Sequence, residues 1–220
     1  LGLRIMRDGK VSDIVLTRTN EEPPNVTSEM VDGKFAHIKV KTFMNQDTAA
    51  QIEKAILDNP KAQGFILDLR NNGGGLLDQA FTSASLFIKE GKVLTIKSRV
   101  PSDPAQPQYE NDVYSVGKDL ITKTVDNGPA KFYAYRHPDR VDKPVVVLVD
   151  QGTASAAEIL AGALKDSDNA YVVGTPTFGK GIGQAIIPDR TAGGATKITT
   201  FRYYTPSGFW PGDGHDTRIG

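Results

Sequence analysis

A serine and a lysine, each on a turn of small residues, are the side chains of this 220-residue chain best suited to chemistry. Ser155 lies in the run GTASAAEI, and Lys180 lies in the glycine-flanked run TFGKGIGQ. A serine hydroxyl attacks a carbonyl only with the help of a neighbouring base. A lysine can be that base when burial lowers its pKa and removes its proton. The two turns therefore indicate a nucleophilic Ser-Lys pair.

The segments around Ser155 suit a nucleophile. Residues 145 to 149 (VVVLV) form a continuous apolar run typical of a buried strand, and residues 156 to 164 favour a helix. Ser155 would then lie at a strand-to-helix turn, where the first backbone N–H groups of the helix, Ala156 the nearest, face a developing oxyanion. The alternative is that Ser155 or Thr153 only caps the helix.

A second turn contains three consecutive glycines, residues 73 to 75. It follows an apolar run at 65 to 69 and precedes a helix-like stretch from 76 to 88. Because glycine has no side chain, the backbone of such a turn can approach a ligand closely and direct its N–H groups inward. The turn is either a second source of oxyanion donors or only a flexible connection.

Three runs of the chain carry a family resemblance: 66–77 (ILDLRNNGGGLL), 147–166 (VLVDQGTASAAEILAGALKD) and 174–184 (GTPTFGKGIGQ). In sequence, order and spacing they resemble the C-terminal processing, or tail-specific, serine peptidases of peptidase family S41. The similarity extends from about Val11 to Asp216.

The resemblance implies a role for each matching residue. Ser155 would be the nucleophile, Lys180 the general base and Gln184 the residue that orients the lysine. The oxyanion hole would consist of the backbone N–H groups of Ala156 and Gly74. The resemblance also implies protein or peptide substrates cut near their C-termini, no metal or organic cofactor, and an extracytoplasmic location such as the periplasm. It leaves the oligomeric state open.

The chain departs from the family pattern in three places. Gly73 stands where the family usually has proline, which predicts a less rigid glycine turn. Ala157 stands where the family usually has a second serine. The segment from 101 to 142 is longer than the resemblance leads us to expect and contains prolines at 101, 104, 107 and 129. We expect this segment to be a mobile or partner-contacting loop.

Two acids follow Ser155 on the same predicted helix. Glu158 lies three residues further on, and Asp166 lies eleven residues further on. At about 1.5 Å rise per residue, Asp166 would be about 16 Å from Ser155, too far for direct proton exchange. We interpret both acids as structural residues that support the Lys180 loop.

Strand and helix patterns alternate along the chain. Strands are expected to begin near residues 36, 65, 93, 145 and 171, and helices near residues 48, 76 and 156. This order predicts an α/β fold of mainly parallel strands. The resemblance identifies it as a crotonase-like and ClpP-like core. A C-terminal β region is expected at 185–187 and 197–204.

The first residues predict a separate unit. Strand-like runs at 3–6 and 14–17 resemble the last strands of the PDZ domain that precedes the peptidase domain in this family, and residues 21–24 (EEPP) favour a linker. We therefore divide the chain into a PDZ remnant with linker, 1–24, and a serine peptidase domain, 25–220. Because the chain opens at Leu1 without a methionine, we expect a fragment or a processed form.

The composition excludes several classes. Twenty-six basic and 26 acidic residues balance without a long run of either sign, so the electrostatic footprint of a nucleic-acid-binding protein is absent. No apolar stretch approaches the length of a transmembrane helix, about 18 residues. The absence of cysteine excludes disulfides and thiolate catalysis.

Other catalytic patterns fit less well. The three histidines, His37, His137 and His215, come without the G-x-S-x-G turn of a Ser-His-Asp hydrolase. The run 174–181 nearly matches a phosphate-binding loop, but Gly181 replaces the serine or threonine that would hold magnesium. The run 115–118 matches S-x-x-K without its companion motifs, and we expect a loop there.

Two rival functions keep the fold but change the chemistry. One is a catalytically silent module that binds lipophilic ligands or proteins, and the other is a crotonase-type enzyme acting on acyl-CoA. The presence of Ser155, Lys180 and Gln184 at matching positions weighs against both.

Overall fold

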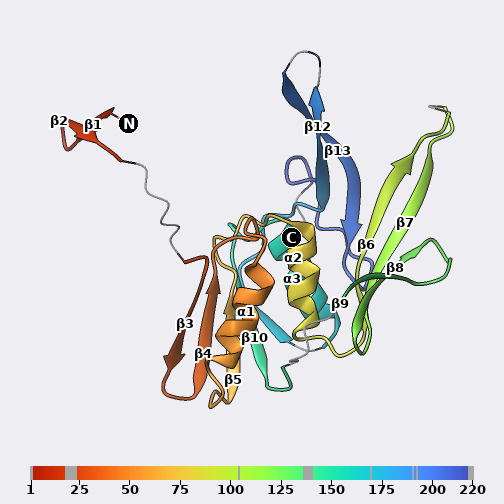
Figure 1. The fold of residues 1–220 in the computed structure, drawn as a ribbon, viewed down its shortest axis with the longest axis horizontal. Helices are drawn as coiled ribbons and strands as arrows, with labels where there is room; N and C mark the ends of the chain where they lie inside the picture. The colour runs from red at the N-terminus through yellow and green to blue at the C-terminus, as the bar shows by residue number, and fades with distance from the viewer. Residues whose placement is uncertain are drawn as a thin grey trace.

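The computed structural model describes residues 2–17, 24–103, 105–135, 141–168, 170–189, 191 and 193–217. Within these ranges the main body consists of a five-stranded sheet, a six-stranded sheet and three helices. Figure 1 shows the helices between the two sheets, and a small hairpin of β1 (Gly2–Arg7) and β2 (Lys10–Val15) standing apart from them.

The central sheet has the strand order β11-β10-β5-β4-β3. Four of its strands are parallel, and β3 joins the edge in the antiparallel direction. Their bounds are β3 (Val26–Val31), β4 (Phe35–Val40), β5 (Gly64–Asp68), β10 (Val145–Val149) and β11 (Ala170–Gly174). The carboxyl ends of parallel strands lie at one edge of a sheet, so the turns after β5 and β10 meet there.

Three helices cover one face of the central sheet. They are α1 (Thr48–Leu57), α2 (Leu77–Ser85) and α3 (Ala156–Asp166). The sheet turns fully buried residues such as Ile38, Leu67 and Val147 toward them. Burying this apolar surface drives the association of sheet and helices.

The second sheet packs against α2 and α3. Its strand order is β12-β13-β6-β7-β8-β9, and all its pairs are antiparallel. The ring of Phe81 on α2 stacks on Tyr114 of β7, with ring centroids 5.0 Å apart, and meets Tyr133 of β9 edge-on at 5.1 Å. The bounds are β6 (Gly91–Val100), β7 (Gln108–Val116), β8 (Leu120–Val125), β9 (Lys131–Tyr135), β12 (Ile182–Asp189) and β13 (Gly194–Tyr204).

This second sheet corrects two predictions. The segment 101–142, predicted to be a loop, contains the strands β7, β8 and β9, and the run 115–118 begins at the end of β7 rather than lying wholly in a loop. The strand expected near residue 93 is β6, which joins the antiparallel sheet instead of the parallel one. Parallel pairing is therefore confined to the central sheet.

The elements of the central layer agree with the sequence patterns. The strand predicted at 145–149 coincides with β10, and the helix predicted at 156–164 runs to Asp166. The α/β prediction is confirmed, while the crotonase-like and ClpP-like assignment stays a prediction. Residues 21–23 of the predicted linker, Pro104 and His137 lie outside the described residues. In the parts of the chain that are described, no helix is both long enough and apolar enough to cross a membrane.

Candidate active site

Ser155 lies at the turn from β10 to α3 in a rare backbone conformation. Its φ is 55° and its ψ is −118°. L-residues seldom adopt this region, which costs about 1–3 kcal/mol. Its N–H donates to Glu158 Oε2 at 2.7 Å, and its carbonyl oxygen accepts the Tyr203 hydroxyl at 3.2 Å and the Ile159 N–H at 3.0 Å. Both peptide groups of the strained residue are thus held by surrounding groups.

Glu158 connects the serine turn to the lysine turn. Its Oε1 accepts the Thr177 hydroxyl and the Gly179 N–H, both at 2.7 Å. Its Oε2 accepts the N–H groups of Ser155 at 2.7 Å and of Lys180 at 2.9 Å. The carboxylate is 4% exposed and lies in the first turn of α3, where the helix dipole favours negative charge. One buried side chain therefore fixes both turns relative to each other.

The turn after Lys180 is held from its other side by the second sheet and the tail. The Gly181 carbonyl accepts the Tyr203 N–H and the indole N–H of Trp210, each at 3.0 Å. The Gly181 N–H donates to the Gly212 carbonyl at 2.6 Å. Lys180 itself is half-buried. Its backbone is therefore fixed on both sides, by Glu158 and by the groups around Gly181.

The glycine turn packs directly against the serine turn. A Cβ at Gly74, whose φ is 89°, would lie 2.6 Å from the Ala154 carbonyl oxygen, 2.8 Å from the Ala156 nitrogen and 2.9 Å from Ser155 Cβ. No larger residue fits between these atoms. The glycine at position 74 is therefore required by contact as well as by its backbone angle.

Asn72 takes part in this contact, and the sequence patterns did not point to it. Its Oδ1 accepts the Gly74 N–H, its Nδ2 donates to the Val40 carbonyl, and its own carbonyl accepts the Ala154 N–H, each at 2.9 Å. The side chain is fully buried. Of the two oxyanion donors implied by the resemblance, the Gly74 N–H is therefore engaged by Asn72 in this structure.

Two predicted site residues have other partners. Gln184 donates through Nε2 to the Thr199 hydroxyl at 3.5 Å, across the β12-β13 ladder. Asp166 accepts the Ser207 N–H at 2.9 Å. Burial would raise the pKa of Asp166, but hydrogen bonds from Thr205 and Ser207 lower it below its ordinary value. Asp166 thus supports the 205–207 turn, not the Lys180 loop as the sequence predicted.

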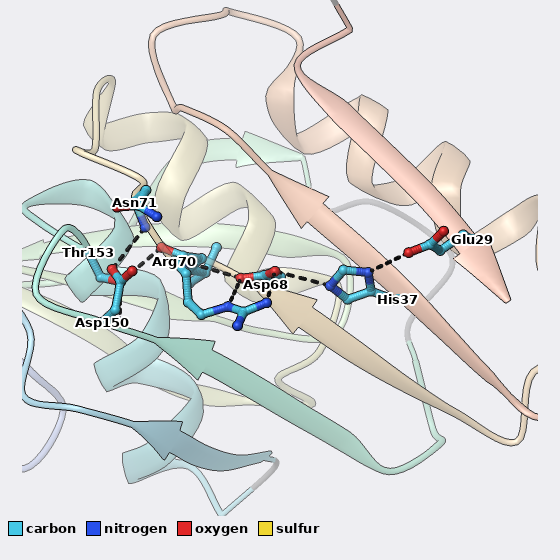
Figure 2. Close-up of polar contacts among 8 residues, drawn as sticks. Glu29, His37, Asp68, Arg70, Asn71, Asp150 and Thr153 are labelled. Carbon is cyan, nitrogen blue, oxygen red and sulfur yellow. Dashed lines mark hydrogen bonds and ion pairs between the residues drawn. The ribbon is translucent and has the colours of Figure 1, made fainter. Parts of the chain in front are cut away.

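A polar network braces the sheet next to the glycine turn (Figure 2). Asp68, at the end of β5, accepts two hydrogen bonds from the Arg70 guanidinium, at 2.9 and 2.8 Å, and lies 3.1 Å from His37 Nε2. Glu29 lies 3.3 Å from the other nitrogen of His37. Burial would raise the pKa of Asp68, but Arg70 and His37 outweigh it and hold the value at about 2.

A second carboxylate at this edge of the sheet binds the first residues of both the glycine turn and the serine turn. Asp150, just after β10, accepts the Asn71 N–H at 2.9 Å (Figure 2). It also accepts the Gly152 N–H at 2.9 Å, and its own N–H donates to the Thr153 hydroxyl at 2.9 Å. That hydroxyl donates in turn to the Leu69 carbonyl at 2.8 Å. Thr153 therefore ties the two turns together. Among the described residues, no three metal-ligating side chains gather into a metal site.

These turns occur in the part of the chain that matches a known family model. The model of peptidase family S41 matches residues 34–217, which include the serine, lysine and glycine turns. The chain belongs to peptidase family S41. The family part of the sequence prediction is confirmed.

Several relatives of the chain have names that refer to C-terminal processing. The carboxy-terminal processing protease CtpA of Bacillus subtilis (strain 168) is 35% identical over 90% of this chain and 37% of its own length. The chloroplastic C-terminal processing peptidase of Tetradesmus obliquus is 33% identical over 84% of this chain and 34% of its own. The chain therefore spans little more than a third of these relatives.

Solved protease structures share the fold. The photosystem II D1 C-terminal processing protease aligns with a TM-score of 0.64 and 28% identity, over 92% of this chain and 49% of that one. A putative S41 protease from Bacteroides fragilis NCTC 9343 aligns with a TM-score of 0.62 and 15% identity, over 100% and 56%.

Proposed function

We propose that this S41 chain is a serine endopeptidase in which Ser155 is the nucleophile and Lys180 the general base. The observation that carries the proposal is the shared carboxylate oxygen: Glu158 Oε2 accepts the backbone N–H of both residues. A nucleophile and its base must keep a fixed separation. Here the backbone N–H groups of both residues donate to the same oxygen atom, which fixes the two backbones relative to each other.

The reaction would proceed in two stages. In the first, the neutral Lys180 amine takes the proton from the Ser155 hydroxyl as the oxygen attacks a peptide carbonyl carbon, and then gives it to the leaving amine. In the second, water activated by the same lysine hydrolyses the acyl-enzyme. Across both stages one peptide bond and one water become a carboxylic acid and an amine.

The negative oxygen of each tetrahedral intermediate would accept hydrogen bonds from the N–H groups of Ala156 and Gly74. The Gly74 donor must then be released by Asn72 or shared with it. Gln184 would orient the lysine amine after leaving Thr199. The proposed mechanism therefore requires both rearrangements.

The names of the relatives support a proposal for the substrate class. Their names describe C-terminal processing, so we propose protein substrates cut near their C-termini. We also propose an extracytoplasmic location and an upstream PDZ domain to which the β1-β2 hairpin would belong. The names of these relatives favour a peptidase over the silent binding module and the acyl-CoA enzyme.

Two substitutions test the Ser-Lys pair on an unfolded protein with an apolar C-terminus, with products identified by mass spectrometry. Ser155→Ala should lower cleavage by on the order of 10⁴-fold or more while folding stays nearly unchanged. Lys180→Arg should be as inactive as Lys180→Ala, because a guanidinium does not give up its proton. An arginine variant that keeps more than about a tenth of the wild-type rate would show that the base lies elsewhere.

A further inference from the structure

Tyr203 is a buried tyrosine of β13 whose hydroxyl points at the serine turn. Its side chain is 1% exposed, and the hydroxyl donates to the Ser155 carbonyl oxygen at 3.2 Å. Its backbone N–H donates to the Gly181 carbonyl, in the turn that follows Lys180. The same residue therefore contacts Ser155 and the residue next to Lys180, although it lies 48 residues after Ser155.

The carbonyl that Tyr203 holds belongs to the same peptide group as the Ala156 N–H. A peptide group is planar, with its oxygen and its hydrogen on opposite sides. Fixing the carbonyl oxygen of Ser155 therefore also fixes the direction of the Ala156 N–H. In the proposed mechanism this N–H binds the oxyanion.

The strain at Ser155 makes this hydrogen bond necessary. At a φ of 55° and a ψ of −118°, the backbone is favoured to rotate toward a commoner conformation. Rotation of ψ would turn the plane of the Ser155–Ala156 peptide. The Ile159 N–H, which also reaches this carbonyl, belongs to the same helix turn and can move with it. Tyr203 comes from another layer of the molecule and provides a fixed reference.

We propose that Tyr203 is a positioning residue that aims the Ala156 N–H at the oxyanion. This inference rests on the proposed function, because it assigns the direction of one donor in that mechanism. It predicts that the hydroxyl acts in the transition state more than in substrate binding, because the oxyanion charge appears only there.

The test removes one oxygen atom. Tyr203→Phe keeps the buried ring, and Tyr204→Phe is a matched control because neighbouring strand residues point to opposite faces. For each variant of this chain, kcat and KM would be measured on a peptide with an apolar C-terminus. Rates would be divided by the concentration of active sites, measured by titration with a peptide boronic acid. Its adduct with serine is a negatively charged, tetrahedral boronate that resembles the tetrahedral intermediate.

We expect Tyr203→Phe to lower kcat by about tenfold, the size expected for one hydrogen bond, with KM unchanged. Affinity for the boronic acid should fall by the same factor, and a melting temperature shift should stay within about 4 °C. Tyr204→Phe should match the wild type in all four quantities. Binding of the uncleaved peptide to Ser155→Ala should not change when Tyr203→Phe is added.

Two results would overturn the inference. One is a Tyr203→Phe variant with wild-type kcat and boronic acid affinity. The other is a loss of stability in which KM and kcat change together and the ratio of boronic acid affinity to substrate affinity stays the same. That result would show that the hydroxyl only supports the fold. Failure of the proposed function is a separate outcome, seen as retained cleavage by Ser155→Ala.

Discussion

Glu158 shows how much a single side chain can organise at the scale of a residue. An ionised carboxylate only accepts hydrogen bonds and can take all four of the donors that surround it here. The serine and lysine turns are far apart in the sequence, so local geometry alone cannot place them. The carboxylate converts two separate turns into one site.

Replacing this carboxylate by an amide should therefore disconnect the site. In Glu158→Gln the NH₂ group would face either the Ser155 and Lys180 N–H groups or the Thr177 and Gly179 donors. An unsatisfied buried donor costs about 1–3 kcal/mol, so we expect kcat to fall on the order of 100-fold and the melting temperature to drop by several degrees. Steady-state kinetics and thermal denaturation would show both effects. Glu90→Gln, at an exposed position, is the control, and wild-type kcat in Glu158→Gln would refute the role given to Glu158.

At the scale of elements, the network around Asp68 joins β3, β4 and β5 just before the glycine turn. The folded pKa of Asp68, about 2, lies below its ordinary value of 3.8. The ionised form is therefore favoured by folding. Its contribution to stability is present above about pH 4 and is lost as the pH falls toward 2.

Urea unfolding at steps from pH 5 to pH 2 would measure this contribution. We expect the free energy of unfolding of the wild type to exceed that of Asp68→Asn at pH 5, and the difference to shrink as the pH approaches 2. The exposed variant Asp119→Asn should follow the wild type over the same range. A difference that stays constant with pH would mean that Asp68 is not ionised in the folded protein.

A third prediction concerns how much the second sheet contributes to stability. Tyr114 is buried against Phe81, so Tyr114→Ala should destabilise the chain by about 3–5 kcal/mol. Tyr109 on the same strand is 52% exposed and interacts with Lys97, so Tyr109→Ala should cost less than about 1 kcal/mol. Denaturant unfolding of the two variants would compare them. Equal small losses would show that the packing of Tyr114 against Phe81 contributes little to stability.

At the scale of the whole molecule, sequence patterns predicted the central layer better than the second sheet. Val145 to Val149 form an uninterrupted apolar run, which few structures other than a buried strand accommodate. In β7 and β8 the buried residues Tyr114, Val116 and Ile121 are separated by polar ones, and nearby prolines suggested a loop. Those strands are specified by long-range pairing, which local patterns do not reveal.

The residues of the candidate site also differ in how well the sequence predicted them. Residues within a motif, such as Ser155 and Lys180, could be proposed from the turns that surround them. Asn72 and Tyr203 could not, because their importance lies in which backbone groups they reach in space. The prediction that Asp166 supports the Lys180 loop was wrong for the same reason. Its observed partner, Ser207 in the 205–207 turn, lies 41 residues further along the chain.

The dependence of Ser155 on Tyr203 has a consequence for how the protein is made. β13 is the last strand of the described chain, and ribosomes deliver the N-terminal part of a chain first. Until β13 docks beside β6, the serine turn has no hydrogen bond from Tyr203, and the turn after Lys180 lacks its partner on that strand. We expect a nascent or partly unfolded chain to be inactive for this reason. Unfolded segments are good substrates for a peptidase, so under the proposed function late completion of the site would limit the cutting of newly made copies by one another.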